Sequence, residues 1–193
     1  MKAAKGWTHE NTLTVKLLLM LAVRKSELIC ARIDEFDLDE AVWHLPAERT
    51  KTGVPIDIPL PRQAVAVLRD LVRLAWGSAW LLPARKMEIR MLPHIDPNTI
   101  NAALAKSIRP LMKESEAFSP HDFRRTARTH LEALGVAPHV AERCLNHKIK
   151  GVVGIYNRHD YFEERRTGLQ MWADLLAEAE RGFAEKVVPI KKR

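Results

Sequence analysis

The 193-residue sequence predicts a mainly α-helical domain with one small antiparallel β-sheet, an α+β arrangement. Apolar residues recur at helical spacing through most of the chain, whereas residues 33–60 hold short segments rich in β-branched and aromatic residues. The apolar fraction is 47% and the charged fraction is 28%, as in globular proteins that bury a core. No internal repeat or low-complexity tract suggests another architecture.

The first half of the chain is expected to contain the sheet between helices. Residues 11–23 predict a mostly buried helix, and a second helix opens at residue 26. The segments "FDLD", "AVWHL" and "VPIDIPL", separated by polar turns, predict two or three strands. Pro61 is suited to the first turn of a helix, which is expected to run to about Trp76 with Val65, Leu68, Val72 and Ala75 on one face.

The second half is expected to be helical after a loop at residues 77–97, which holds three prolines. Gly135 is placed to end one of these helices, since glycine readily adopts the left-handed conformation found there. The predicted helices cover residues 98–108, 120–134, 138–145 and 161–179, and a basic tail, "VVPIKKR", follows.

Charge and composition restrict the classes of partner. The net charge of +7 favours an anionic partner, with nucleic acid ahead of a membrane surface. The longest apolar run, residues 17–23, is far shorter than the roughly 20 residues of a membrane span, and no secretory signal is evident. Cys30 and Cys144 have no second pair, so no disulfide framework is implied and a reducing cytoplasm is the expected compartment.

The segment "SPHDFRRTARTHL" predicts a helix with one apolar and one basic face. At about 100° per residue, the apolar stripe holds Phe123, Ala127, Leu131 and Leu134, and the opposite side holds His121, Arg124, Arg125 and Arg128. Any amphipathic surface helix produces this pattern, so the basic face indicates a ligand only if partners lie elsewhere in the chain.

Candidate partners precede and follow this helix. Arg24 ends an apolar run and is costly to desolvate unless it pairs, with Glu27 for example, or points into a cleft. Lys51 lies in a turn between two predicted strands, where a lysine is usually just solvated. His147 ends the segment "LNH", and Tyr156 follows nine residues later.

Other kinds of site are less well supported. His139, Cys144 and His147 have a spacing that suggests zinc, but a complete ligand set is not evident. No Gly-x-Ser-x-Gly elbow indicates a serine hydrolase. The segment "EALGVAPHVAERCLNHK" has the rhythm of a helix-turn-helix, so a non-catalytic DNA-binding module stays an alternative.

The order of the basic residues resembles a known family. Arg24, Lys51, "HDFRR", "LNH" and "YNRHDY" together resemble the catalytic domain of tyrosine recombinases, the phage integrase family, in the form found in prophages and genomic islands. The resemblance runs from about Leu13 to Ala179. It implies the fold of that catalytic domain and site-specific DNA recombination, the integration or excision of a mobile element, through a 3′-phosphotyrosine intermediate. It implies no cofactor and no metal.

The resemblance also implies roles for the basic residues. Arg24 and Arg124 match the arginines that clamp the scissile phosphate, and arginine suits this because its planar fork donates two parallel hydrogen bonds. His121 and His147 would complete the pocket and assist proton transfer. Lys51 would protonate the leaving 5′-oxygen.

The resemblance implies Tyr156 as the nucleophile, because the family's spacing from histidine to tyrosine selects it, and cationic neighbours would favour ionisation of its phenol. Tyr161, the only other tyrosine, lies five residues further on and is expected to pack at the start of the last helix. Glu27 would support the site by orienting a basic partner, and Arg125 and Arg128 are expected to contact the DNA backbone.

The resemblance implies double-stranded DNA attachment sites as the substrate and a homo-tetramer on DNA. Residues 1–180 would form the catalytic domain and residues 181–193 a basic tail that exchanges between protomers. The N-terminal core-binding domain of the family is expected to be absent from this chain. A type IB topoisomerase-like enzyme, which would reseal the same strand, is an alternative that shares the nucleophile and the basic pocket.

Overall fold

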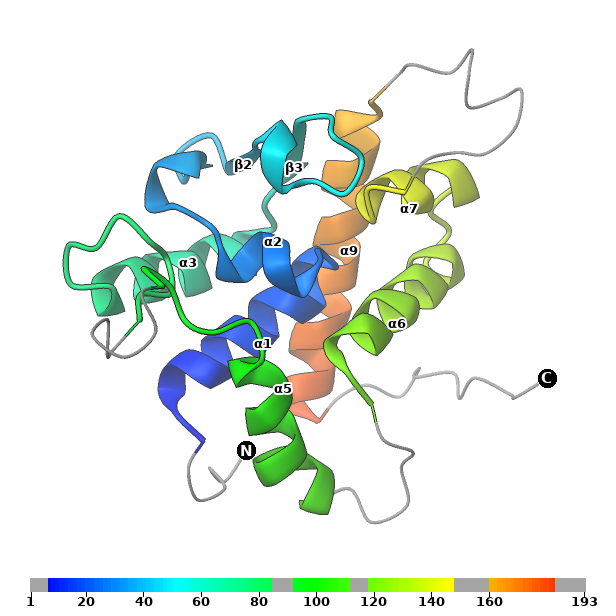
Figure 1. The fold of residues 1–193 in the computed structure, drawn as a ribbon. Coiled ribbons are helices and arrows are strands. Elements are labelled where there is room, and N and C mark those ends of the chain that lie inside the picture. The colour runs from blue at the N-terminus through cyan, green and yellow to red at the C-terminus, as the bar shows by residue number, and fades with distance from the viewer. Residues whose placement is uncertain (1–6, 85–91, 112–117, 148–159, 183–193) are drawn as a thin grey trace.

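The computed structural model describes residues 7–84, 92–111, 118–147 and 160–182 (Figure 1). The predicted class, mainly helical with one small sheet, is confirmed. The helices are α1 (His9–Leu21), α2 (Lys25–Ile29), α3 (Arg62–Leu74), α5 (Thr99–Ala103), α6 (Pro120–Ala133), α7 (Pro138–Cys144) and α9 (Phe162–Arg181). Single turns of other helix types are η1 (Ile33–Glu35), η2 (Ala47–Arg49), η3 (Leu104–Ile108) and η4 (Arg109–Leu111). The strands are β1 (Phe36–Asp37), β2 (Val42–Leu45) and β3 (Ile56–Pro59).

The predicted sheet forms with three antiparallel strands in the order β1-β2-β3. Trp43, at the centre of β2, pairs with Phe36 on one side and Ile58 on the other and is completely buried. Its indole nitrogen donates to Glu35, 2.9 Å away, so the one polar atom of the ring has a partner. The connection from β2 to β3 carries η2 and Lys51.

A first hydrophobic cluster joins α1, α2, α3, α5 and the sheet. Helix α1 begins two residues earlier than predicted, because the Thr8 hydroxyl accepts a hydrogen bond from the backbone N–H of Asn11 and caps the helix. Leu17 and Leu21 are completely buried in this cluster. The long apolar run of α1 therefore reflects a helix that is covered on most sides.

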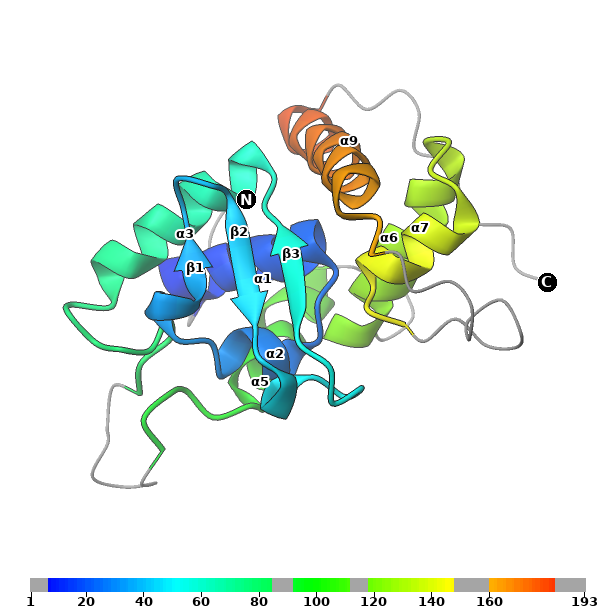
Figure 2. The same ribbon diagram turned by 90° about the horizontal axis from the view of Figure 1, so that it is seen from above.

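A second cluster joins α6, α7 and α9. Helix α9 contributes to both clusters and lies between the sheet and the α6–α7 pair in the two views (Figures 1 and 2). The indole nitrogen of Trp172 on α9 donates to the carbonyl of Leu19, 2.8 Å away, and so ties α9 to α1. Ala22 belongs to the second cluster whereas Leu21 and Val23 belong to the first, so the α1–α2 connection forms the seam between them.

Two predicted helices differ in detail. Pro61 is the cap that precedes α3 rather than its first residue, and the buried face holds Ala64, Leu68 and Leu71. Val65 and Val72 lie at the border of that face and are half-buried. The helix expected over residues 98–108 keeps α-helical hydrogen bonding only in α5 and widens to a π-type turn in η3.

The start of α9 is fixed by a buried arginine. Arg165 is 1% exposed, and its Nε and Nη1 donate to the backbone carbonyls of Asp160 and Asp57 at 2.9 and 2.8 Å. Its Nη2 also pairs with the Asp160 carboxylate. Arg165 therefore ties the residues before α9 to strand β3. Among the described residues, no helix is long and apolar enough to span a membrane.

We expect Arg165→Met to lower the free energy of unfolding by about 1–3 kcal/mol, because the carbonyls of Asp57 and Asp160 lose the buried donor that joins them. The adjacent Arg166 is exposed, stacks on the Phe162 ring and pairs with Glu163 at 3.4 Å, so Arg166→Met should change stability by less than about 0.5 kcal/mol. Urea denaturation of both variants measures the difference. Equal losses in the two would contradict the assigned role of Arg165.

Candidate active site

Arg124, which the sequence analysis placed on the side of its helix opposite the apolar stripe, is buried, with 4% of its surface exposed. Its Nη1 donates to the carbonyl of Ala22, and its Nη2 donates to the carbonyl of Leu145 at 2.6 Å. These carbonyls end α1 and α7, where helices leave acceptors unpaired and carry partial negative charge. The placement was wrong because Arg124 precedes Leu131 by seven residues, about two helical turns, so at about 100° per residue it lies beside that buried leucine. The role of Arg124 as a phosphate-clamping arginine stays a prediction.

The start of α6 sets the direction of Arg124. Ser119 precedes Pro120, which has no N–H to leave unpaired, and the Asp122 carboxylate accepts from the backbone N–H and hydroxyl of Ser119, both at 2.9 Å. These hydrogen bonds lower the pKa of Asp122. His121 is exposed on the first turn and lies three residues before Arg124, so the two side chains are neighbours on the helix surface.

Arg24 lies on the seam between the two clusters. Ala22, which has a left-handed φ of 50°, ends α1, and Arg24 then precedes α2 as its cap residue. Glu27, only 1% exposed, accepts from the Arg24 backbone N–H at 2.7 Å and from Arg24 Nη1 at 2.8 Å. The expected orienting role of Glu27 thus has a geometric basis. Arg49 adds a hydrogen bond to the Glu27 carbonyl at 2.9 Å.

The two arginines converge on one turn. Arg24 Nη2 lies 3.4 Å from the carbonyl of Asn146, and Arg124 donates to the preceding carbonyl of Leu145. Burial, followed by the positive charge of Arg24, lowers the pKa of Arg124 to about 10, although the carboxylates of Glu27 and Glu142 oppose this shift. Such a pair of cations favours binding of an anion, because its negative charge would offset both the cost of desolvating Arg124 and the repulsion between the two guanidinium groups.

His147 is held beside Arg124 by the end of α7. Asn146 has a left-handed φ of 50°, and its N–H and that of His147 donate to the carbonyls of Arg143 and Glu142, both at 3.0 Å. This is the Schellman arrangement that often ends helices. The Nδ1 of His147 lies 2.6 Å from the Glu142 carboxylate, and its Nε2 lies 3.1 Å from Arg124 Nη2.

Arg128 and Arg125 differ in their surroundings. Arg128 Nε donates to Glu142 at 2.7 Å, and its Nη1 lies 2.7 Å from Glu132. Arg125 is 76% exposed and pairs only loosely with Asp122, at 3.2 Å. Both remain predictions as contacts for DNA, and Arg125 has the more accessible guanidinium.

Lys51 and the two tyrosines complete the set of residues that the sequence analysis singled out. Lys51 is exposed on the connection from β2 to β3, which lies next to the end of α7 in both views (Figures 1 and 2). Tyr156 and most of the predicted exchange tail lie outside the described residues. Tyr161 precedes α9 and packs edge-on against His139, with 4.8 Å between ring centroids, as the sequence predicted for it.

Both cysteines are unpaired, and they lie in different surroundings. Burial raises the pKa of the Cys144 thiol to about 12, so it stays protonated. Among the described residues, no group of three histidine, cysteine, aspartate or glutamate side chains could hold a metal ion.

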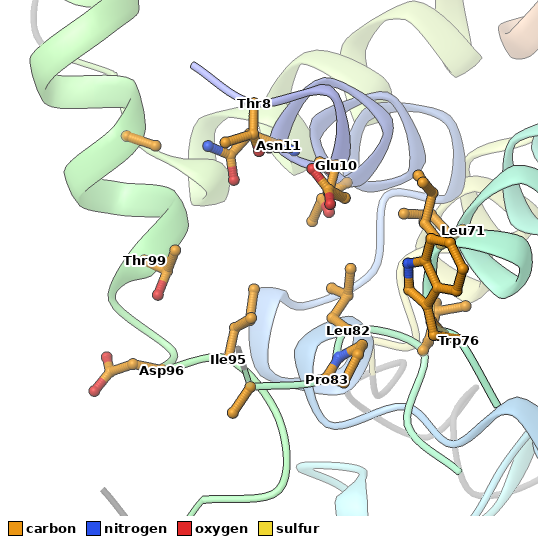
Figure 3. A pocket seen from close by; sticks show the side chains of 16 residues that line it. Thr8, Glu10, Asn11, Leu71, Trp76, Leu82, Pro83, Ile95, Asp96 and Thr99 are labelled. Carbon is orange, nitrogen blue, oxygen red and sulfur yellow. Dashed lines mark hydrogen bonds between the residues drawn. The ribbon is translucent and has the colours of Figure 1, made fainter. Parts of the chain in front are cut away.

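A groove with a volume of about 800 Å³ lies away from these residues. It is lined from α1, α3 and α5, with Trp76 on one side and Asp96 and Thr99 on the other (Figure 3). Trp76 is 90% exposed. None of the predicted site residues within the described part of the chain lines this groove.

Comparison with known proteins decides the family. The model of the "Phage integrase family" matches residues 1–163. The chain belongs to the phage integrase family. The resemblance inferred from the basic residues is therefore confirmed at the level of the family.

Relatives of this phage integrase chain are longer than the chain itself. It is 34% identical over 165 residues to Prophage integrase IntA of Escherichia coli K12, which covers 85% of the chain and 38% of that protein. It is 32% identical over 179 residues to the Integrase of Enterobacteria phage P4, with 85% and 39% covered. The chain thus spans less than two fifths of the length of these relatives.

Solved structures support the fold. The integrase from mycobacterium phage Brujita matches with a TM-score of 0.61 at 16% identity, covering 84% of this chain and 52% of that one. XerA recombinase matches with a TM-score of 0.52 at 16% identity, covering 90% and 64%. The observed arrangement of helices and sheet is therefore that of the tyrosine recombinase fold.

Sequence reasoning did not identify Glu142 as part of this phage integrase site. Its carboxylate bridges Arg128 and His147, and its pKa is lowered although burial acts to raise it, because hydrogen bonds from those two residues outweigh burial. The sequence holds one signal for Glu142, which is its position five residues before His147. In a helix-ending turn of this type, the backbone N–H of a residue donates to the carbonyl five residues earlier, so the turn brings Glu142 close to His147.

We expect inorganic sulfate to stabilise the folded chain, because a dianion would offset the positive charges of Arg24 and Arg124. At a concentration 100 times its dissociation constant, a bound anion adds about 2.7 kcal/mol. Each kcal/mol raises the melting temperature of a chain this size by about 2–4 °C. Melting curves at constant ionic strength, with sulfate exchanged for chloride, measure the shift.

Sulfate also stabilises proteins without binding a site, so Arg24→Gln serves as the control. The specific part of the shift should disappear in this variant, whereas Arg62→Gln, which changes an exposed arginine on α3, should keep it. Identical shifts in all three proteins would refute an anion site at the arginine pair.

Proposed function

We propose that this chain provides the catalytic domain of a site-specific DNA recombinase, residues 1–180, which cleaves and rejoins DNA strands through a 3′-phosphotyrosine on Tyr156. The observation that carries the proposal is the convergence of Arg24, Arg124 and His147 on the turn that ends α7. Membership of the phage integrase family supports the same reaction class.

The arginine pair suits a phosphodiester. Attack on phosphorus concentrates negative charge on the non-bridging oxygens, and preorganised donors stabilise that charge. Arg124 is held by carbonyls of two helix ends and Arg24 by Glu27, so neither guanidinium needs to be ordered when the phosphate arrives. Their planar groups would each donate to a non-bridging oxygen.

The remaining steps concern protons and the covalent bond. The Tyr156 oxygen would attack phosphorus and form a new P–O bond while the bond to the 5′-oxygen breaks. A histidine, His121 or His147, would accept the phenolic proton, and Lys51 would give a proton to the leaving 5′-oxygen. Attack by another strand's 5′-hydroxyl reverses these steps, so rejoining needs no external energy source and no cofactor.

The choice of Tyr156 over Tyr161 rests on spacing and packing. Tyr156 follows His147 by nine residues, as the resemblance to the family implies. Tyr161 is partly buried in the second hydrophobic cluster, against His139, where its ring helps to fix the start of α9. Using Tyr161 as the nucleophile would require this packing to be undone.

The alternative of a non-catalytic DNA-binding module accounts less well for the positions of the two arginines. A helix-turn-helix module reads DNA with side chains exposed on its second helix. Here Arg124 is turned inward, and α7 uses its C-terminal carbonyls to hold the two arginines. A type IB topoisomerase-like reaction would use the same site, so product analysis must separate it from recombination.

The proposed substrates are double-stranded attachment sites, bound in the cytoplasm by four copies of the protein. In this proposal residues 181–193 dock on a neighbouring copy. A chain that ends at Ala179 should therefore lose the tetramer on DNA while keeping the fold and the DNA contacts of each copy. Analytical ultracentrifugation with attachment-site DNA measures the assembly. A truncated chain that still forms the tetramer would rule out this role for the tail.

The first test is covalent trapping. The protein is incubated with nicked duplexes from the junctions of the mobile element that encodes it, and denaturing gels reveal a protein–DNA adduct. The wild type should form the adduct, and Tyr156→Phe should lose it entirely, because phenylalanine has no nucleophilic oxygen. Tyr161→Phe serves as the matched control and should retain the adduct.

Each outcome of the trapping gel bears on a different part of the proposal. An adduct that survives Tyr156→Phe would move the nucleophile elsewhere. Adducts that resolve only to the original strand, with supercoils relaxed and no partner exchanged, would support the topoisomerase-like reaction instead. No adduct, even when the upstream part present in the longer relatives is added, would favour a binding module.

A further inference from the structure

A chain of four charged or polar side chains runs from the surface of α6 into the phosphate site. Arg128 Nε donates to Glu142 Oε1 at 2.7 Å, and Glu142 Oε2 lies 2.6 Å from His147 Nδ1. His147 Nε2 lies 3.1 Å from Arg124 Nη2. Each distance is short enough for a hydrogen bond, so the orientation of one group limits the next.

The donor and acceptor roles in this chain follow from chemistry. A guanidinium has only donors, so Arg124 must donate and His147 Nε2 must accept. The proton of the neutral ring is then on Nδ1, which donates to the Glu142 carboxylate. When Nε2 gains a proton, Nδ1 still donates to Glu142, but Nε2 no longer accepts from Arg124, so the ring keeps its carboxylate partner and loses the hydrogen bond from the guanidinium.

Glu142 holds His147 through the main chain as well. The carbonyl of Glu142 accepts the backbone N–H of His147 at 3.0 Å, in the turn made by the left-handed Asn146. The same residue therefore fixes both the backbone and the ring of His147. A lone surface carboxylate would hold the ring less firmly, because a long side chain loses rotamer freedom when it is ordered.

Arg128 completes the arrangement. It pairs with Glu142 and with the more exposed Glu132, 2.7 Å from its Nη1. The positive charge of Arg128 offsets that of the Glu142 carboxylate, which would otherwise oppose an incoming phosphate. The structure thus gives Arg128 a role inside the protein that differs from the DNA contact expected for it.

We propose that Glu142 is a positioning residue of the phosphate site, which holds His147 in the Nδ1–H tautomer with Nε2 directed toward Arg124 and the phosphate, and that Arg128 holds Glu142 in turn. This inference rests on the proposed function for its catalytic consequence. The tautomer itself depends only on the fold. Comparable carboxylate–histidine pairs orient ring nitrogens in metal sites and in serine proteases.

The first measurement is a two-bond ¹H–¹⁵N correlation spectrum of the histidine rings, recorded without DNA above pH 8, where an unperturbed histidine is neutral. His147→Gln assigns the signal by its disappearance. The wild type should show His147 protonated on Nδ1. A wild-type signal for the Nε2–H tautomer would overturn the proposal without any variant that could misfold.

The second measurement compares Glu142→Gln with Glu132→Gln. Arg128 and His147 contact different oxygens of Glu142, and Glu142→Gln replaces one of these by an NH2 donor. With its oxygen turned to the guanidinium of Arg128, the glutamine presents the NH2 group to His147 Nδ1, so the Nδ1–H form should lose its dominance. Glu132 touches Arg128 but not His147, so its variant should keep the wild-type tautomer. An unchanged tautomer in a folded Glu142→Gln protein would contradict the role of Glu142.

The catalytic consequence is measured by the rate of covalent adduct formation. Glu142→Gln should slow it by about 10–100-fold, the range typical when a group that orients a metal-ligating histidine is lost, and Glu132→Gln should leave it nearly unchanged. A normal rate in Glu142→Gln would reject the catalytic part of the proposal. Failure of the wild type to form any adduct would reject the proposed function instead, since the tautomer is read independently.

Discussion

The guanidinium of Arg124 ties together the ends of two helices. It accepts no hydrogen bond and has only donors, so it must find acceptors once it is buried, and it finds them at the ends of α1 and α7. Helix α1 packs in the first hydrophobic cluster and α7 in the second. Arg124 therefore adds to the links that α9 makes between the clusters, and the candidate site is built where the clusters meet.

The free-energy cost of burying the charge of Arg124 makes the site favour an anionic ligand over a neutral one. Desolvation and the neighbouring Arg24 both disfavour the charged form of Arg124, and the carboxylates of Glu27 and Glu142 compensate only in part. An arriving phosphate would complete the compensation. The same feature that limits the stability of the free protein thus favours the bound state, and a neutral ligand of the same shape would lack this advantage.

Much of this architecture follows from sequence patterns, and its exceptions have physical causes. The strands, the proline and glycine boundaries and the helix after residue 120 are local signals, and the structure has them close to where they were expected. The carbonyls that accept from Arg124 belong to Ala22 and Leu145, which are distant in sequence, so the pattern around α6 does not show them. The order of basic residues indicated the family, yet Glu142 was overlooked because a glutamate on a short helix resembles any surface charge. Tyr156, on which the chemistry depends, lies outside the described residues.

The acceptors that hold Arg24 and Arg124 at α7 are main-chain oxygens of residues 145 and 146. Every amino acid carries such an oxygen, so the side chains at these two positions are not what the arginines recognise. The requirement falls on the backbone instead, since Asn146 must adopt a left-handed conformation that asparagine and glycine tolerate well. Evolutionary drift can thus replace the side chain at position 145 by others that fit the core, while selection at 146 acts on a torsion angle rather than on a functional group.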